Sequence, residues 1–437
     1  MIRWRWLFEK FFPVVFSGIR LWREKCWRPQ RLAWVTLLMA WDEGQTLSSR
    51  WEHAKDTARC WHPSWKLGTS YGGFSEALVR SSETLLKAIK ARLCRQMRQF
   101  EPRCGSGWRW GAFAVDGTRF EAPHVEANER GLGCAGREKT GPQVFATMLW
   151  HMGTGLPWDF RVGPGTDSER KHLESLIDDL PQGSLLIADA GFVGYELCRK
   201  IHRSGQFFLF RVGSNITLLT KLGYEYQERR GLVYLWPQKQ RHQPPLVLRL
   251  IKVKRRAQTI YLLTNVLDAR QLTLAEASRL YEMRWGIEVF YRSAKQTLER
   301  RRLLSRTPAT CLIEAQWTLL GIWLLGLLTV RELVERKIDP VEISYAKARD
   351  VVRGEMRRAT RVTSRSRRRP PLDKLRQELA SASKDRYHRS RPKRARNYPR
   401  KKRERPPGPP KIRSATLKEQ ATAKRFRELT SPYCRTA

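Results

Sequence analysis

The pattern of apolar and polar positions divides the chain into three regions. In residues 1–105, apolar residues recur at helical spacing between short breaks, which predicts a helical domain. Residues 106–335 begin with short apolar runs separated by turn residues and end in a helical pattern, which predicts one α/β domain. Residues 336–437 predict a helical extension and then a basic tail, which we expect to be largely disordered.

The middle region opens with the order strand, strand, strand, helix, strand. A run of small and β-favouring residues at 111–115 predicts a strand that ends in a turn at Asp116. Residues 143–162 predict a hairpin, and a helix follows it. The apolar run 184–188 predicts a buried strand that ends at Asp189. An acidic residue therefore follows the first and the last of these strands.

Alternating apolar residues over about 214–265 predict a mainly antiparallel, β-rich insertion ahead of a second helical region. In that helical region, Tyr281, Arg284, Glu288 and Lys295 share one stripe about 60° wide, if each residue advances about 100° around a straight helix.

Arg292 lies at the edge of the same stripe. One carboxylate among several cations and a phenol suits a phosphodiester held beside a metal ion. A salt-bridged surface helix would have the same spacing, because Glu288 and its neighbouring arginines lie four residues apart. The spacing alone leaves both interpretations open.

The charge of the chain points to a polyanionic partner. The formal net charge is +42, from 84 Lys and Arg against 42 Asp and Glu. From residue 351 onward there are 29 basic and 7 acidic residues, a surplus of 22, so the first 350 residues carry a surplus of 20. Because both parts are basic, nucleic acid is the first candidate partner.

The cysteines and the apolar segments bear on the compartment. The eight cysteines contain no C-x-x-C pair, which favours neither a zinc site nor a disulfide framework. Glu9, Lys10 and Pro13 interrupt the apolar N-terminus, so we expect no signal peptide. The apolar run 317–330 is too short to span a bilayer and predicts a buried core helix. We therefore expect a cytoplasmic protein that does not enter a membrane.

The N-terminal region contains a candidate DNA-reading helix. Thr46 offers a cap ahead of a helix that carries Arg50, Lys55 and Arg59, which would suit the groove-entering element of a helix-turn-helix. An ordinary basic helix face is the alternative.

Taken together, these residues resemble the DDE transposases of bacterial insertion sequence family four. The third carboxylate of that family lies in a Y-x2-R-x3-E-x6-K signature, which Tyr281, Arg284, Glu288 and Lys295 match without a mismatch. The first acidic motif of the family is matched by Asp116-Gly117-Thr118 and the second by Asp189-Ala190-Gly191-Phe192. The resemblance covers residues 105–335 approximately.

The resemblance implies an RNase H-like mixed-sheet core in which Asp116, Asp189 and Glu288 bind two Mg²⁺ ions, with Mn²⁺ able to substitute. It implies cutting at transposon ends and joining of those ends to target DNA. The expected phosphate-contacting residues are Tyr281, Arg284, Arg292 and Lys295. The expected partners are double-stranded DNA, with terminal inverted repeats read by residues 1–105, and a second copy of the chain in the DNA complex. A bacterial, nucleoid-associated protein would fit these partners.

Some alternatives stay open at this level. Asp159 and Asp167 lie near the core strands and could replace one of the two chosen aspartates. Trp236 in the insertion could stack on a displaced base, although a strand-core tryptophan is the simpler interpretation. A catalytically inactive, domesticated DNA-binding protein and a simple metal-dependent nuclease would share the composition, but all three carboxylates and the signature cations are present.

Overall fold

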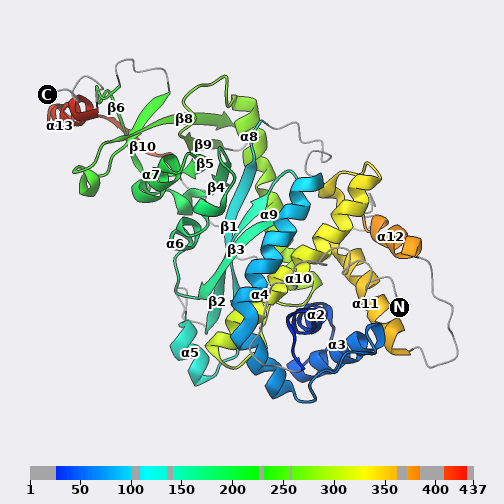
Figure 1. The fold of residues 1–437 in the computed structure, drawn as a ribbon. Helices are drawn as coiled ribbons and strands as arrows, with labels where there is room; N and C mark the ends of the chain where they lie inside the picture. Colours follow the sequence, from blue (N-terminus) through cyan, green and yellow to red (C-terminus); the bar gives the residue numbers. More distant parts are fainter. Residues whose placement is uncertain are drawn as a thin grey trace, which may run out of the picture. The chain divides into compact units, whose positions relative to one another are not determined.

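Figure 1 shows the computed structural model, which describes residues 26–100, 109–134, 141–225, 231–255, 258–361, 372–383 and 408–430. The chain forms two compact units, and neither is continuous in sequence. The first unit contains Met1–Gly107, Gly117–Ser168 and Gly286–Asp385, and the second contains Trp108–Asp116, Glu169–Trp285 and Arg386–Ala437. The functional boundaries near residues 105 and 335 stay a prediction.

The first unit is mainly helical. Its helices are α2 (Pro29–Trp41), α3 (Leu47–Trp61), α4 (Tyr71–Phe100), α5 (Glu126–Leu132), α9 (Trp285–Arg292, which belongs to this unit from its second residue), α10 (Pro308–Glu335), α11 (Tyr345–Arg361) and α12 (Leu372–Ala380). Helix α10 packs against α2, α4, α11 and α12, so it is the central helix of this unit (Figure 1).

Helix α10 contains the apolar run that was expected to form the core. Every residue from 317 to 330 is buried, which confirms the prediction of a core helix. Among the described residues, α10 is the one helix long and apolar enough to cross a membrane by length and composition, and 78% of its most apolar window is buried inside the protein. Its apolar character is therefore explained by packing.

The first unit also contains a hairpin. Strands β2 (Gln143–His151) and β3 (Leu156–Pro164) pair antiparallel, as predicted, and the register shifts by a bulge between Leu149 and Trp150. The order of strands here is β1-β2-β3.

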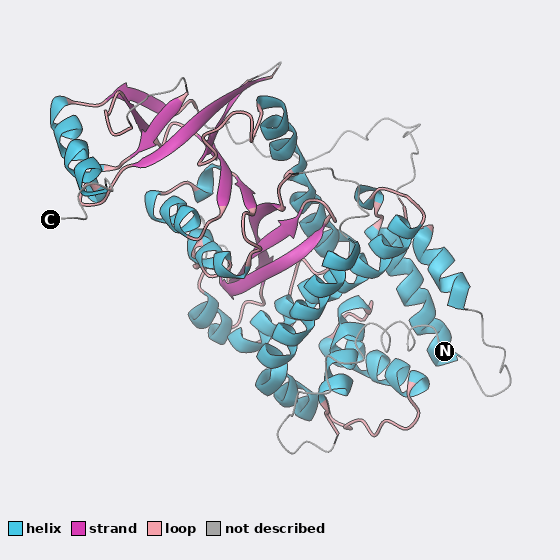
Figure 2. Ribbon diagram, turned by 45° about the horizontal axis from the view of Figure 1, so that its top comes forward, coloured by secondary structure: helices cyan, strands magenta, loops and turns pink. Residues whose placement is uncertain are grey.

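The second unit is built on a mixed sheet in the order β10-β6-β7-β8-β9-β5-β4-β1 (strands magenta in Figure 2). Its strands are β4 (Leu185–Ala188), β5 (Phe207–Val212), β6 (Thr217–Thr220), β7 (Leu232–Leu235), β8 (Leu246–Lys254), β9 (Thr259–Thr264) and β10 (Lys411–Ser414), with the first residues of β1. Its helices are α6 (Glu169–Glu174), α7 (Tyr195–Arg203), α8 (Leu274–Met283) and α13 (Leu417–Thr430). Strand β4 pairs in parallel with β1 on one side and with β5 on the other. Strand β5 pairs antiparallel with β9, and the insertion strands β6, β7, β8 and β9 pair antiparallel in that order. The expected α/β class, with a mixed sheet and a β-rich insertion, is confirmed.

The C-terminal region contributes more structure than its composition indicates. Strand β10 adds in parallel to the insertion strand β6, and α13 follows it. Glu419 of α13 is nearly fully buried and accepts hydrogen bonds from Arg413 at 2.6 and 2.8 Å. The other parts of the predicted disordered tail, residues 362–371, 384–407 and 431–437, lie outside the described residues.

Strand β1 (Ala112–Glu121) differs from the prediction. The sequence predicted that it ends before Asp116, but the strand continues through Asp116, Gly117 and Thr118. This prediction was wrong because an Asp-Gly pair is typical of a turn when it stands alone. Pairing with neighbouring strands overrides that local preference.

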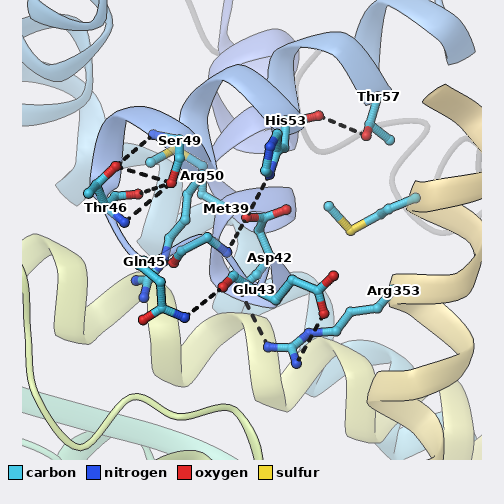
Figure 3. A network of polar contacts seen from close by, with 12 residues as sticks. Met39, Asp42, Glu43, Gln45, Thr46, Ser49, Arg50, His53, Thr57 and Arg353 are labelled. Atoms are coloured by element: carbon cyan, nitrogen blue, oxygen red, sulfur yellow. Dashed lines mark hydrogen bonds and ion pairs between the residues drawn. The ribbon is translucent and has the colours of Figure 1, made fainter.

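Helix α3 begins as predicted, but its cations do not form one exposed face. Thr46 and Ser49 cap its N-terminus reciprocally (Figure 3). Arg50 is buried and donates to the carbonyl of Gly44 at 2.7 Å. Lys55 is also buried, with its ammonium 3.8 Å from the ring centre of Trp51. The predicted DNA-reading face is therefore wrong for two of its three cations.

Candidate active site

The two aspartates are positioned by neighbouring parallel strands. Strand β1 pairs with β4 in parallel, and the last register pair is Ala114 with Ile187. Asp116 and Asp189 each lie two residues beyond that pair, so their side chains leave the same side of the sheet at the same level. Parallel pairing thus brings together two carboxylates that are 73 residues apart in the sequence.

Arg284 faces both carboxylates. Its Nη1 lies 3.9 Å from Oδ2 of Asp116, and its Nη2 lies 4.0 Å from Oδ2 of Asp189. The arginine side chain is 9% exposed, whereas those of Asp116 and Asp189 are 24% and 46% exposed. One guanidinium therefore offsets the repulsion between two carboxylates that solvent and cations can still reach.

Tyr281 supports the second carboxylate. Its hydroxyl donates to Oδ1 of Asp189 at 3.3 Å. Burial, and then the negative charge of Asp189, raise the pKa of Tyr281 above its ordinary value. The phenol therefore stays protonated and remains a hydrogen-bond donor at neutral pH.

The signature helix is not straight. Helix α8 ends at Met283, α9 begins at Trp285, and a π-helix follows over Ser293–Thr297. The single stripe predicted from 100° per residue is therefore wrong as geometry, because a constant rotation holds only within one regular helix. Tyr281 and Arg284 belong to the second unit, and the signature residues from Glu288 onward belong to the first.

The signature residues in the first unit have distinct environments. Glu288 is half-buried on α9, and Arg292 is exposed. The ammonium of Lys295 lies 5.6 Å from the ring centre of Phe120. Within the described residues, no group of three or more His, Cys, Asp and Glu side chains is arranged as a metal site. That Glu288 joins the two aspartates stays a prediction.

Two alternative site residues have other partners. Asp159 accepts a hydrogen bond from the ammonium of Lys90 at 2.6 Å, so it already forms an ion pair in the first unit. Trp236 is buried, and its Nε1 donates to the carbonyl of Gln243 at 2.7 Å. The idea that Trp236 stacks on a base is not supported, because its ring is buried and lies against Phe426 of α13.

Sequence reasoning missed two residues of the signature region. Trp285 is 54% exposed, which is unusual for so large an apolar side chain, and Gly286 follows it. Both lie between Arg284 and Glu288 and could have been noticed as positions that a straight-helix pattern does not explain.

Part of this chain is similar to DDE-type transposases. Residues 111–324 match the family model described as "Transposase DDE domain", which confirms the resemblance found in the sequence. The chain is 28% identical over 216 residues to the transposase InsG for insertion sequence element IS4 of Escherichia coli (strain K12). That match covers 46% of this chain and 48% of the relative, so the chain spans about half the length of the curated relative that it matches.

A solved structure is also similar. It is the cryo-EM structure of the piggyBac transposase synaptic complex with hairpin DNA, at 12% identity and a TM-score of 0.36, covering 88% of this chain and 82% of that chain.

Proposed function

We propose that this chain is a DNA transposase that cuts at transposon ends and joins those ends to target DNA by DDE phosphoryl transfer. The observation that carries the proposal is the pair Asp116 and Asp189, level on parallel strands and facing the Arg284 guanidinium within 4.0 Å. Glu288 is proposed as the third carboxylate, because its place in the signature matches the family.

The donor set fits divalent cations. Carboxylate oxygens are the ligands that Mg²⁺ prefers, and both aspartate side chains are exposed enough for a cation to reach them. Two Mg²⁺ ions held by Asp116, Asp189 and Glu288 would supply Lewis-acid activation of the phosphodiester. We propose Mn²⁺ as a substitute for Mg²⁺.

The signature cations are proposed to hold the DNA. Arg284 would bind a phosphate near the cleaved end, because a guanidinium presents two donors to one phosphate. Arg292 and Lys295 would also contact phosphates, the first through a guanidinium and the second through a compact ammonium charge. Tyr281 would keep Asp189 oriented through its hydroxyl.

The proposed partners are double-stranded DNA and a second copy of the chain. The net charge of +42 favours phosphate contact by both the folded units and the tail. Recognition of terminal inverted repeats is proposed for residues 1–105, and synapsis of two ends would require a dimer. The proposed location is the bacterial cytoplasm, at the nucleoid.

Cleavage of a plasmid that carries the flanking inverted repeats tests this function. The wild-type protein is expected to nick and join DNA with Mg²⁺ and to lose both activities with EDTA. Asp116→Asn, Asp189→Asn and Glu288→Gln should each abolish cleavage and keep end binding, whereas Asp159→Asn and Asp167→Asn should keep cleavage. Binding without cleavage by the wild type under any divalent ion would instead support an inactive DNA-binding protein. Cleavage without joining would support a nuclease.

A further inference from the structure

The first turn of α9 makes an unusually close contact with the β2–β3 hairpin. A Cβ atom added at Gly286 would lie 2.2 Å from Cη2 of Trp150, and 2.8 Å from both Cζ2 and Cζ3 of the same ring. Carbon atoms in ordinary contact are about 3.5 Å apart or more. At this point, α9 can approach the hairpin only because residue 286 has no side chain.

Trp150 cannot easily move away. It is 5% exposed, and the bulge between Leu149 and Trp150 changes the register of β2 at this residue. Its buried Nε1 has no hydrogen-bond partner among the described residues, so shape and not a polar contact holds the ring. An unsatisfied buried donor destabilises the folded protein, so close packing of the ring must offset that cost.

The contact with Trp150 lies on the side of α9 opposite Glu288. Two residues along an α-helix correspond to about 200° of rotation, so Glu288 leaves α9 on the side nearly opposite Gly286. A side chain at residue 286 would therefore push α9, and the Glu288 carboxylate with it, by about 1 Å away from Trp150.

We propose that Trp150 and Gly286 are positioning residues that fix where α9 presents the Glu288 carboxylate. The inference rests on the proposed function, because Glu288 must be a metal ligand for its position to matter. A displacement of about 1 Å at a reacting group can cost a hundredfold in rate.

The test compares DNA cleavage as a function of Mn²⁺ concentration with the melting temperature of each full-length variant. Gly286→Ala should lower the cleavage rate about a hundredfold and raise the half-saturating Mn²⁺ concentration. Adding Trp150→Phe removes the atoms that clash, so the double variant should recover most of the wild-type cleavage rate and of the wild-type Mn²⁺ dependence. A purely structural role would change only the melting temperature.

Two glycine variants serve as matched controls. Gly321→Ala places a Cβ 2.8 Å from Cβ of Ala40, so it should lower the melting temperature without changing the Mn²⁺ dependence. Gly72→Ala enters open space and should change neither. If Gly286→Ala does not fold, Trp150→Phe alone still tests the inference, because loss of the ring contact should by itself raise the half-saturating Mn²⁺ concentration.

Several results would overturn the inference. One is a wild-type half-saturating Mn²⁺ concentration in Gly286→Ala, and another is no recovery of cleavage in the double variant. A third is the same rise in half-saturating Mn²⁺ concentration in Gly321→Ala. If Gly286→Ala cannot be folded, an unchanged half-saturating Mn²⁺ concentration in Trp150→Phe would also overturn it. If Glu288→Gln abolishes cleavage while Gly286→Ala does not, the proposed function stands and only this inference fails. If the wild-type protein shows no metal-dependent cleavage, both the proposed function and this inference fail.

Discussion

Asp116 and Asp189 lie at the same level of two adjacent parallel strands, each two residues beyond the register pair Ala114 and Ile187. Arg284 lies within 4.0 Å of both carboxylates. Under the proposed function, Arg284 and the divalent cations would compete for the same carboxylate oxygen atoms.

Replacing Arg284 should separate metal binding from DNA cleavage. Arg284→Gln removes a positive charge about 4 Å from two proposed metal ligands, so the half-saturating Mg²⁺ concentration should fall severalfold. The maximal cleavage rate should fall about tenfold or more, because a phosphate contact is lost. Arg284→Lys keeps the charge and should keep the wild-type Mg²⁺ dependence. An unchanged or higher half-saturating Mg²⁺ concentration in Arg284→Gln would contradict the competition.

The Tyr281 hydroxyl should contribute to activity without titrating in the working range. Burial and the negative charge of Asp189 raise the pKa of Tyr281 above its ordinary value, so the neutral donor form persists through neutral and mildly alkaline pH. Tyr281→Phe should lower the cleavage rate about fivefold to tenfold, from a hydrogen bond worth about 1 kcal/mol. A pH–rate profile should show the same ratio of the wild-type cleavage rate to the Tyr281→Phe cleavage rate at pH 7 and at pH 9. A ratio that collapses toward one at pH 9 would show that the phenol ionises there.

The contribution of Glu419 to the stability of β10 against the insertion should depend on pH. Hydrogen bonds from Arg413 lower the pKa of the buried Glu419 carboxyl far below its ordinary value. Its stabilising contribution is therefore complete above about pH 4.5 and is lost as the pH falls toward the folded-state pKa.

Glu419→Gln should reduce the free energy of opening of β10 by about 2 kcal/mol at pH 7, because Arg413 and Arg241 of the insertion both lose their charged partner. Hydrogen exchange of the β10 amides measures this effect. Below about pH 4.5 the difference from wild type should shrink. Equal exchange in both proteins at pH 7 would mean that the carboxylate does not anchor the strand. Glu428→Gln, in the same C-terminal region, is the matched charge control.

Two arginines of α3 should differ in their effect on stability. Arg50→Ala should lower the free energy of unfolding by about 2 kcal/mol, because the Gly44 carbonyl loses its donor and the buried packing of the arginine side chain is lost. Arg59 is 43% exposed, and Arg59→Ala should change stability by less than about 0.5 kcal/mol. Thermal or urea unfolding compares the two. Equal losses would show that Arg50 is not held by burial.

The sequence determined most of what is regular in this protein. Local patterns identified the hairpin, the buried strand Leu185–Ala188 and the core helix α10, because periodicity and turn residues act over a few positions. The spacing of the signature residues predicted a resemblance to DDE transposases, and the match of residues 111–324 to the transposase DDE domain model confirms that resemblance.

Only the tertiary structure decided which side chains face one another. The break between α8 and α9, the continuation of β1 through Asp116 and the addition of β10 to β6 all depend on partners far away in the sequence. The same holds for the burial of Arg50 and Trp236, whose polar atoms are satisfied by carbonyls that no local pattern reveals. Strand pairing and side-chain packing are sums of long-range contacts, so they can override a turn preference or a regular helical rotation.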